Sequence, residues 1–285
     1  MSATQRAPLP RPALRWHGGK WRLAPWIIEH FPAHRVYVEP FGGAASVLLR
    51  KPRSYAEIYN DLDGEVVSLF RVLRDPSLAA QLQQQLGLTP FARSEWLAAY
   101  DWCADPVEQA RRLIVRSFMG YGSDATRRDL TTGFRSNSTR SGTTPARDWL
   151  NYPELLPGLT DRLAGVVVEN RPAAEVMARH DGPDVLHYVD PPYMRSTRNI
   201  SHRGHGYNHE LNDEDHRILL RQLRSLRGAV IVSGYPHPLY DAGLPDWSRV
   251  ERTAHADGAR LRKEVLWLNH AAAQQRQPSL RLVQA

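Results

Sequence analysis

The stretch that decides the fold is Val36-Tyr37-Val38-Glu39-Pro40-Phe41-Gly42-Gly43-Ala44-Ala45-Ser46-Val47. Its apolar start predicts a buried strand, its two glycines predict a tight loop, and the small residues that follow predict a helix. Glycine allows the backbone to turn sharply and to approach a bound molecule closely. A strand, a glycine loop and a helix in this order indicate an α/β sheet with a ligand site at the loop.

Apolar runs elsewhere in the chain extend this pattern. Buried parallel strands are predicted at residues 185–189 and 229–232, and helices at residues 65–73 and 213–226. Shorter runs predict further strands at residues 58–59 and 166–168 and a closing strand at residues 265–268. Strands that alternate with helices predict an α/β sheet whose chemistry lies at the carboxyl ends of the strands.

A carboxylate follows the second predicted strand, where Ile58-Tyr59 lead into Asn60-Asp61. An acid at the end of a second strand can hold the ribose hydroxyls of a nucleoside. The glycine loop and Asp61 together predict a cofactor that contains adenosine. The alternative role for Asp61 is the N-cap of the helix that follows.

The predicted strand at residues 185–189 ends in Asp190-Pro191-Pro192-Tyr193. Two prolines cannot continue a central strand, so a rigid turn should expose Asp190 and Tyr193. The pattern suits an amino group on an aromatic base, which is a poor nucleophile because its lone pair is delocalised into the ring. A carboxylate and a backbone carbonyl can accept its two hydrogens and favour the pyramidal form, and Tyr193 offers a face for stacking an extruded base. The alternative, a proline-rich turn with an incidental acid, is disfavoured because a strand and a cofactor loop precede it.

Composition indicates an intracellular protein with a polyanionic partner. The net charge is +7, with 34 arginines against Lys20, Lys51 and Lys263, and basic side chains that neutralise phosphates release counterions. A single cysteine, Cys103, excludes an internal disulfide, which favours a reducing cytoplasm. No apolar run has membrane-spanning length, and residues 1–15 lack the apolar stretch of a signal peptide.

Residues 76–159 interrupt the alternation of strands and helices. This region is first helical and polar and then rich in Ser, Thr, Gly and Arg. Between Arg111 and Arg147 lie eight arginines but only two acids, together with aromatic residues. Such a segment can contact phosphates with arginine and bases with aromatic side chains, although a solvated loop explains the arginines equally well.

These motifs, in this order, resemble the Dam-like class of DNA adenine N6-methyltransferases, including phage-borne members. The resemblance covers residues 14–269 and begins at Leu14-Arg15-Trp16-His17-Gly18-Gly19-Lys20, where tryptophan, two glycines and lysine recur in the family. The glycine loop, Asp61 and the tetrapeptide 190–193 follow in the family's order. Further similarity lies in Asp215-His216, in Ser233-Gly234-Tyr235 and in residues 264–269.

The resemblance implies a Rossmann-like S-adenosylmethionine-dependent methyltransferase sheet with a mainly helical and loop target-recognition insert. We expect residues 1–75 and 160–270 to form the catalytic domain, residues 76–159 the insert and residues 271–285 a tail. The cofactor would be S-adenosylmethionine, the partner double-stranded DNA and the protein a cytoplasmic monomer without a required metal. The implied cofactor-binding residues are Trp16, Lys20, Phe41, Gly43, Asp61 and Asp190. The implied catalytic residues are Asp190, Pro191, Pro192 and Tyr193, and the expected DNA-binding residues are Arg15, Arg127, Arg128 and Arg135.

The chain departs from the family pattern at three places. His17 stands where a small residue is usual, and Ala45 stands where the loop often has another glycine. After the strand at residues 166–168 the family usually has an acid followed by Phe, whereas this chain has Glu169-Asn170-Arg171. No contact with the cofactor adenine is therefore predicted there.

Several alternatives remain open from the sequence. N4-cytosine methylation uses the same amino-group chemistry, although Asp rather than Ser before the two prolines favours adenine. Methylation of RNA or of a protein amide, and a DNA-binding protein without activity, are further alternatives. Cys103 lies away from every motif, which disfavours C5-cytosine methylation because that reaction needs a thiolate nucleophile. Three histidines, His202, His205 and His209, accompany arginines after the tetrapeptide, where a DNA-facing loop is favoured over a metal site.

Overall fold

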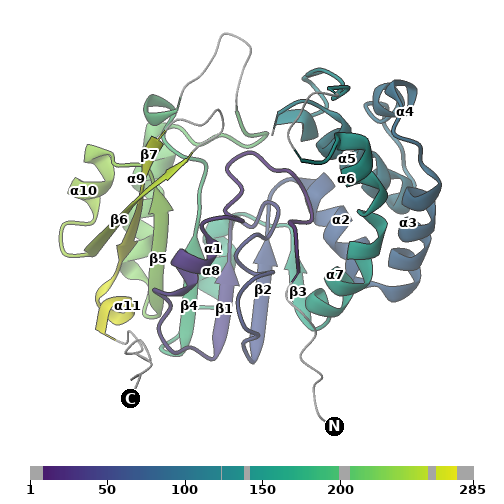
Figure 1. The fold of residues 1–285 in the computed structure, drawn as a ribbon. Helices are drawn as coiled ribbons and strands as arrows, with labels where there is room; N and C mark the ends of the chain where they lie inside the picture. The colour runs from purple at the N-terminus through teal and green to yellow at the C-terminus, as the bar shows by residue number, and fades with distance from the viewer. Residues whose placement is uncertain (1–8, 123, 138–141, 199–205, 256–260, 275–285) are drawn as a thin grey trace, which may run out of the picture.

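In the computed structural model, a seven-stranded sheet forms the centre of the molecule (Figure 1). The structure describes residues 9–122, 124–137, 142–198, 206–255 and 261–274. The strand order is β3-β2-β1-β4-β5-β7-β6; β1 to β5 are parallel, and β7 is antiparallel to both of its neighbours. The strands are β1 (Val36–Glu39), β2 (Ala56–Asn60), β3 (Val166–Glu169), β4 (Val185–Val189), β5 (Ala229–Gly234), β6 (Ser248–His255) and β7 (Leu261–Leu268).

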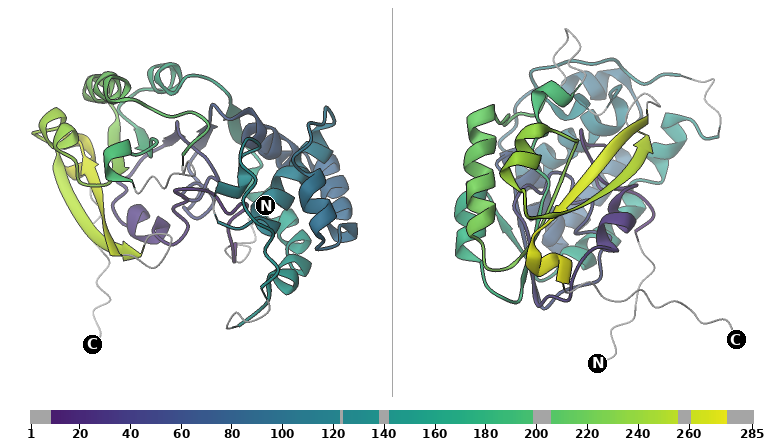
Figure 2. Two further views of the ribbon diagram at one scale, coloured as in Figure 1. Left: turned by 90° about the horizontal axis from the view of Figure 1, so that it is seen from above. Right: turned by 90° about the vertical axis from the view of Figure 1, so that its left-hand side faces the viewer.

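Helices cover both faces of the sheet. Figure 2 shows α8 (Ala173–Arg179) and α9 (Asp213–Ser225) on one face and α1 (Ala24–Ile28) on the other. Side chains alternate accordingly along the strands, as in β5, where Val230 packs in the cluster of α9 and Ile231 packs in the cluster of α1. The inner strand β5 is buried on both faces, which explains why its first four residues are continuously apolar.

The helices between β2 and β3 form a second layer of packing beyond the edge of the sheet (Figure 1). The helices α3, α5 and α7 all pack against α2, and one apolar cluster joins them to the sheet. These helices are α2 (Gly64–Arg74), α3 (Pro76–Leu88), α4 (Arg93–Ala98), α5 (Pro106–Met119), α6 (Pro145–Leu150) and α7 (Leu156–Leu163). The remaining α-helices of the described residues are α10 (Pro238–Gly243) and α11 (His270–Gln274).

Local sequence signals explain where these helices begin. The carboxylates of Asp63, Asp75 and Asp105 accept backbone N–H groups at the first turns of α2, α3 and α5. Proline follows in the first turn of α3 and α5, where a missing N–H costs nothing. Asn212 and Asp215 form a reciprocal capping box at the start of α9.

The structure confirms the predicted α/β class, the Rossmann-like sheet and every strand expected from the sequence. It adds β6, which the sequence analysis did not predict because only its partner β7 has a continuous apolar run. The helix predicted after the glycine loop was wrong: residues 43–50 form successive turns. Ala45 has φ +52° there, a left-handed conformation that a regular right-handed helix cannot contain.

No helix among the described residues combines the length and the apolar character that crossing a bilayer requires.

Candidate functional site

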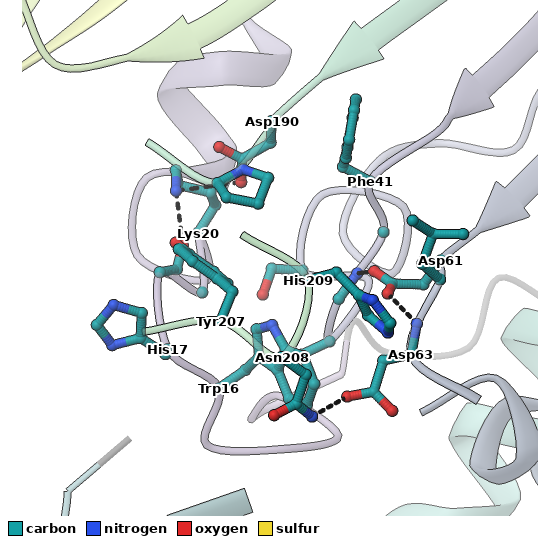
Figure 3. Close-up of a pocket in the computed structure, with 18 of the residues that line it drawn as sticks. Trp16, His17, Lys20, Phe41, Asp61, Asp63, Asp190, Tyr207, Asn208 and His209 are labelled. Atoms are coloured by element: carbon teal, nitrogen blue, oxygen red, sulfur yellow. Dashed lines mark hydrogen bonds and ion pairs between the residues drawn. The ribbon is translucent and has the colours of Figure 1, made fainter. Parts of the chain in front are cut away.

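A cavity of about 420 Å³ opens at the carboxyl ends of β1, β2 and β4 (Figure 3). The strand order reverses between β1 and β4, and ligands of open α/β sheets bind at such a switch point. All six residues predicted to bind the cofactor line this cavity, namely Trp16, Lys20, Phe41, Gly43, Asp61 and Asp190. Parallel strands thus bring together residues that are far apart in the sequence.

The glycine loop forms one wall of the cavity. Gly43 has φ +47°, and a Cβ added there would lie 2.6 Å from Nε1 of Trp16. Its N–H donates to Oδ2 of Asp61 at 2.8 Å, and its carbonyl accepts the Tyr59 hydroxyl at 2.7 Å. Gly43 therefore permits both a left-handed turn and the close approach of Trp16.

Asp61 is fixed by the backbone at the end of β2. Its two carboxylate oxygens accept the N–H groups of Gly43 and Asp63, each at 2.8 Å. Burial raises the pKa of Asp61 to about 6, although these two hydrogen bonds oppose the shift. Asp63, and not Asp61, caps α2, which leaves Asp61 to face the cavity.

Lys20 and Asp190 form an ion pair on the other side of the cavity. The Lys20 Nζ lies 3.1 Å from Asp190 Oδ2, and only 5% of Lys20 is exposed. Burial alone would lower the pKa of Lys20, but Asp190 and Glu264 raise it above its ordinary value. The second oxygen of Asp190 accepts the Ser233 hydroxyl at 2.7 Å. A donor on each oxygen thus orients the carboxylate of Asp190.

A second acid, Glu39, lies at the base of the cavity and was not predicted as a site residue. It accepts the Tyr37 hydroxyl at 2.7 Å and the Leu48 N–H at 3.0 Å. Burial raises the pKa of Glu39 to about 8, and the nearby charge of Asp190 adds to the shift. Burial thus favours the protonated form of this carboxyl group, which can donate a hydrogen bond.

Residues 206–211 lie across the cavity, between the Lys20 side and the Asp61 side (Figure 3). Asn208 donates to Asp63 at 2.7 Å, and the ring of Tyr207 packs edge-on against His17 at a centroid distance of 5.0 Å. The sequence does not predict these contacts, because the segment has no periodic apolar pattern. His209 lines the cavity, whereas His202, Arg203 and His205 lie outside the described residues.

The residues of the tetrapeptide 190–193 differ in their exposure to the cavity. Pro192 lines the cavity beside Asp190, whereas only 6% of Tyr193 is exposed. Tyr193 donates its hydroxyl to Glu264 Oε2 at 3.0 Å, and the Lys20 Nζ lies 4.6 Å from the centre of its ring. The sequence led us to expect an exposed Tyr193, but the strand β7 covers its hydroxyl end.

The four arginines predicted to bind DNA have protein partners in this structure. Arg127 lines the cavity and pairs with Asp129, and Arg128 forms an ion pair with Glu65. Arg15 donates to the carbonyl of Gly120 at 3.4 Å, and Arg135 donates to the carbonyl of Phe118 at 3.0 Å. Arg15 and Arg135 thus both bind the end of α5.

The sequence of the chain is similar to known proteins over most of its length. The model of the family described as D12 class N6 adenine-specific DNA methyltransferase matches residues 16–233. A DNA adenine methylase of Salmonella typhi is 26% identical over 265 residues, which cover 89% of this chain and 92% of the relative. A DNA adenine methylase of Escherichia coli K12 is 38% identical over 64 residues, which cover 22% of this chain and 23% of the relative.

Proposed function

The chain belongs to the D12 class of N6 adenine-specific DNA methyltransferases, and on that premise we propose that its cavity binds S-adenosylmethionine beside an adenine that has left the duplex. The protein is thus a DNA adenine methyltransferase. The identity of its cofactor, its catalytic residues and its contacts with DNA are our proposals. The observation that carries the proposal is the convergence of the six predicted residues on one cavity at the switch point of the sheet.

The cavity fits S-adenosylmethionine in size and in chemistry. Its volume of about 420 Å³ lies within the range of about 300–1,000 Å³ that small-molecule sites occupy. Asp61 would accept hydrogen bonds from the ribose, and Trp16 and Phe41 provide aromatic surface. Lys20 carries the positive charge that a carboxylate of the cofactor needs. When bound, the cofactor supplies a methyl group on a positively charged sulfur.

Asp190 would bind the amino group of the target adenine. Its two present partners, Lys20 and Ser233, both donate, so the carboxylate acts purely as an acceptor. A carboxylate has about four acceptor positions, which leaves room for a further N–H. The carbonyl of Pro191 would accept the second hydrogen of the amino group. Two acceptors favour the pyramidal nitrogen whose lone pair attacks the methyl group.

The position of Asp190 inside a cavity supports base flipping. Asp190 lines the cavity, whereas the amino group of an adenine in a duplex is held inside the base stack. Enzymes that modify a base therefore turn it out of the stack, at a cost of a few kcal/mol. We propose that the extruded adenine stacks on the ring of Tyr193, which lies three residues after Asp190 and next to Lys20.

The insert would recognise the target site. The described part of residues 76–159 contributes Asp124, Thr126 and Arg127 to the lining of the cavity. Arg15, Arg127, Arg128 and Arg135 would contact phosphates, and their present bonds to protein groups would be exchanged for bonds to DNA. Charged hydrogen bonds to phosphate are strong enough to compete with such contacts.

The test is a methyl-transfer assay on duplex DNA with S-adenosylmethionine, followed by digestion to nucleosides. We expect N6-methyladenine as the product and saturable binding of S-adenosylmethionine in calorimetry. Asp61→Asn should weaken that binding, and Asp213→Asn, which changes an exposed acid on α9, should not. N4-methylcytosine as the product, or binding that is insensitive to Asp61→Asn, would contradict the proposal.

A further inference from the structure

The strand β7 places one carboxylate, Glu264, against the catalytic tetrapeptide. Because β7 is antiparallel to β5, with Val265 paired to Gly234, Glu264 reaches the edge at which β4 and β5 end. Only 8% of Glu264 is exposed, and its Oε2 accepts the hydroxyl of Tyr193 at 3.0 Å. The following residues, Val265 to Leu268, are all buried and apolar, as expected for a strand in the core.

A carboxylate at this position is costly for stability. Burial raises the pKa of Glu264, even though Lys20 and the hydroxyl of Tyr193 oppose the shift. Replacing buried ionic groups by apolar residues is often neutral or stabilising, so packing alone does not account for an acid here. The contacts of Glu264 with the reacting end of the molecule indicate what it does.

The ring of Tyr193 is held on three sides. Glu264 binds its hydroxyl, the ring of Tyr235 packs edge-on at a centroid distance of 4.7 Å, and the Lys20 Nζ lies over its face. The bond to Glu264 is the directional one among these contacts, because it fixes the far end of the ring. Without it, the ring could tilt toward the space that the target base has to enter.

We propose that Glu264 is a positioning residue for adenine methylation, which holds Tyr193 in its stacking orientation while Asp190 binds the target. This proposal rests on the proposed function, in which Asp190 and Tyr193 contact the extruded adenine. Glu264 acts through these residues and does not itself contact the reacting atoms.

The test compares single-turnover methylation by Glu264→Ala, Glu264→Gln, Tyr193→Phe and the double variant Glu264→Ala/Tyr193→Phe at saturating DNA and S-adenosylmethionine. Because a small misplacement of reacting groups can cost about a hundredfold in rate, we expect Glu264→Ala and Tyr193→Phe each to slow methylation by about tenfold to a hundredfold. The double variant should be no slower than the slower single variant, because both changes break one interaction. Glu264→Gln should be much faster than Glu264→Ala, since its amide oxygen still accepts the hydroxyl.

The matched control is Glu251→Ala, on the neighbouring strand β6, where the acid is partly exposed and pairs with Lys263 at 3.1 Å. Its methylation rate should equal that of the unchanged protein. A purely structural role for Glu264 would lower the melting temperature of Glu264→Ala and leave its single-turnover rate unchanged, which would overturn the proposal. A double variant whose rate loss equals the product of the two single losses would also overturn the proposal. Absence of N6-methyladenine with the unchanged protein would instead overturn the proposed function.

Discussion

Asp61 should make cofactor binding depend on pH. Burial raises its pKa from 3.8 to about 6 in the protein without cofactor, which corresponds to about 3 kcal/mol at 1.36 kcal/mol per pKa unit. The ribose hydroxyls would donate to the ionised form, so binding should be pH-independent well above pH 6. Below pH 6 the carboxyl group must first lose its proton, and affinity should fall about tenfold per pH unit, so that it is about tenfold weaker at pH 5 than at pH 7.

The free energy of unfolding of the protein without cofactor should decrease as the pH rises, whereas the affinity for the cofactor increases. Because the pKa of Asp61 is raised in the folded state, the folded protein binds this proton more tightly than the unfolded chain does. The contribution of Asp61 to the free energy of unfolding is therefore greatest below pH 3.8 and decreases by about 3 kcal/mol as the pH rises through 6. A group that costs stability when ionised, yet improves binding when ionised, is typical of a ligand site.

Calorimetric titration of S-adenosylmethionine between pH 5 and pH 8 measures this effect. The control is Asp61→Asn, which retains Glu39 and every other titrating group, so the difference between the two profiles reports Asp61 alone. At pH 8 the variant should bind more weakly by about 1.5–3 kcal/mol, since hydrogen bonds to a charged group are lost. A break near pH 6 that persists in Asp61→Asn, or equal affinities at pH 8, would refute the assignment of Asp61 to the ribose.

Three further changes have expected outcomes. Ser233→Ala removes a hydrogen bond to charged Asp190 and should slow single-turnover methylation by about tenfold or more, given about 1.5–3 kcal/mol for such a bond; an unchanged rate would show that Ser233 does not orient Asp190. Arg127→Ala should lower the log–log slope of DNA affinity against salt by about 0.9 if Arg127 contacts a phosphate; an unchanged slope would mean that Arg127 stays paired with Asp129 when DNA is bound. Ala45→Gly relieves a left-handed conformation that costs about 1–2 kcal/mol but removes a buried methyl group worth about 0.8 kcal/mol, so the free energy of unfolding in urea should change by less than about 1 kcal/mol; a loss of about 2 kcal/mol or more would contradict the strain at Ala45.

The sequence was sufficient for six of the seven strands and for the six predicted cofactor-binding residues around the cavity, for a physical reason. Apolar runs predict buried parallel strands, and the carboxyl ends of such strands meet at one edge, so Gly43, Asp61 and Asp190 had to lie close together. The order of the motifs added Trp16 and Lys20, which precede the first strand and have no periodic pattern of their own.

The remaining features depend on pairings that no local pattern encodes. The antiparallel register of β7 places Glu264 against Tyr193, and this register follows from the packing of the sheet. The ion pair between Lys20 and Asp190 joins distant parts of the chain. Similarly, Arg128 appeared free to contact DNA because its partner, Glu65, lies on α2, outside the arginine-rich region.

The most direct test of the central claim is single-turnover methylation of duplex DNA by Asp190→Asn. Asparagine keeps the size of the side chain but removes the charge and presents an NH2 donor toward the amino group of adenine. Circular dichroism should first establish that Asp190→Asn is folded, and Asp213→Asn serves as the control for loss of an exposed acid. If Asp190 stabilises the attacking amino group, the rate should fall by about 10²–10³ while DNA and S-adenosylmethionine still bind. A rate near that of the unchanged protein would contradict the account.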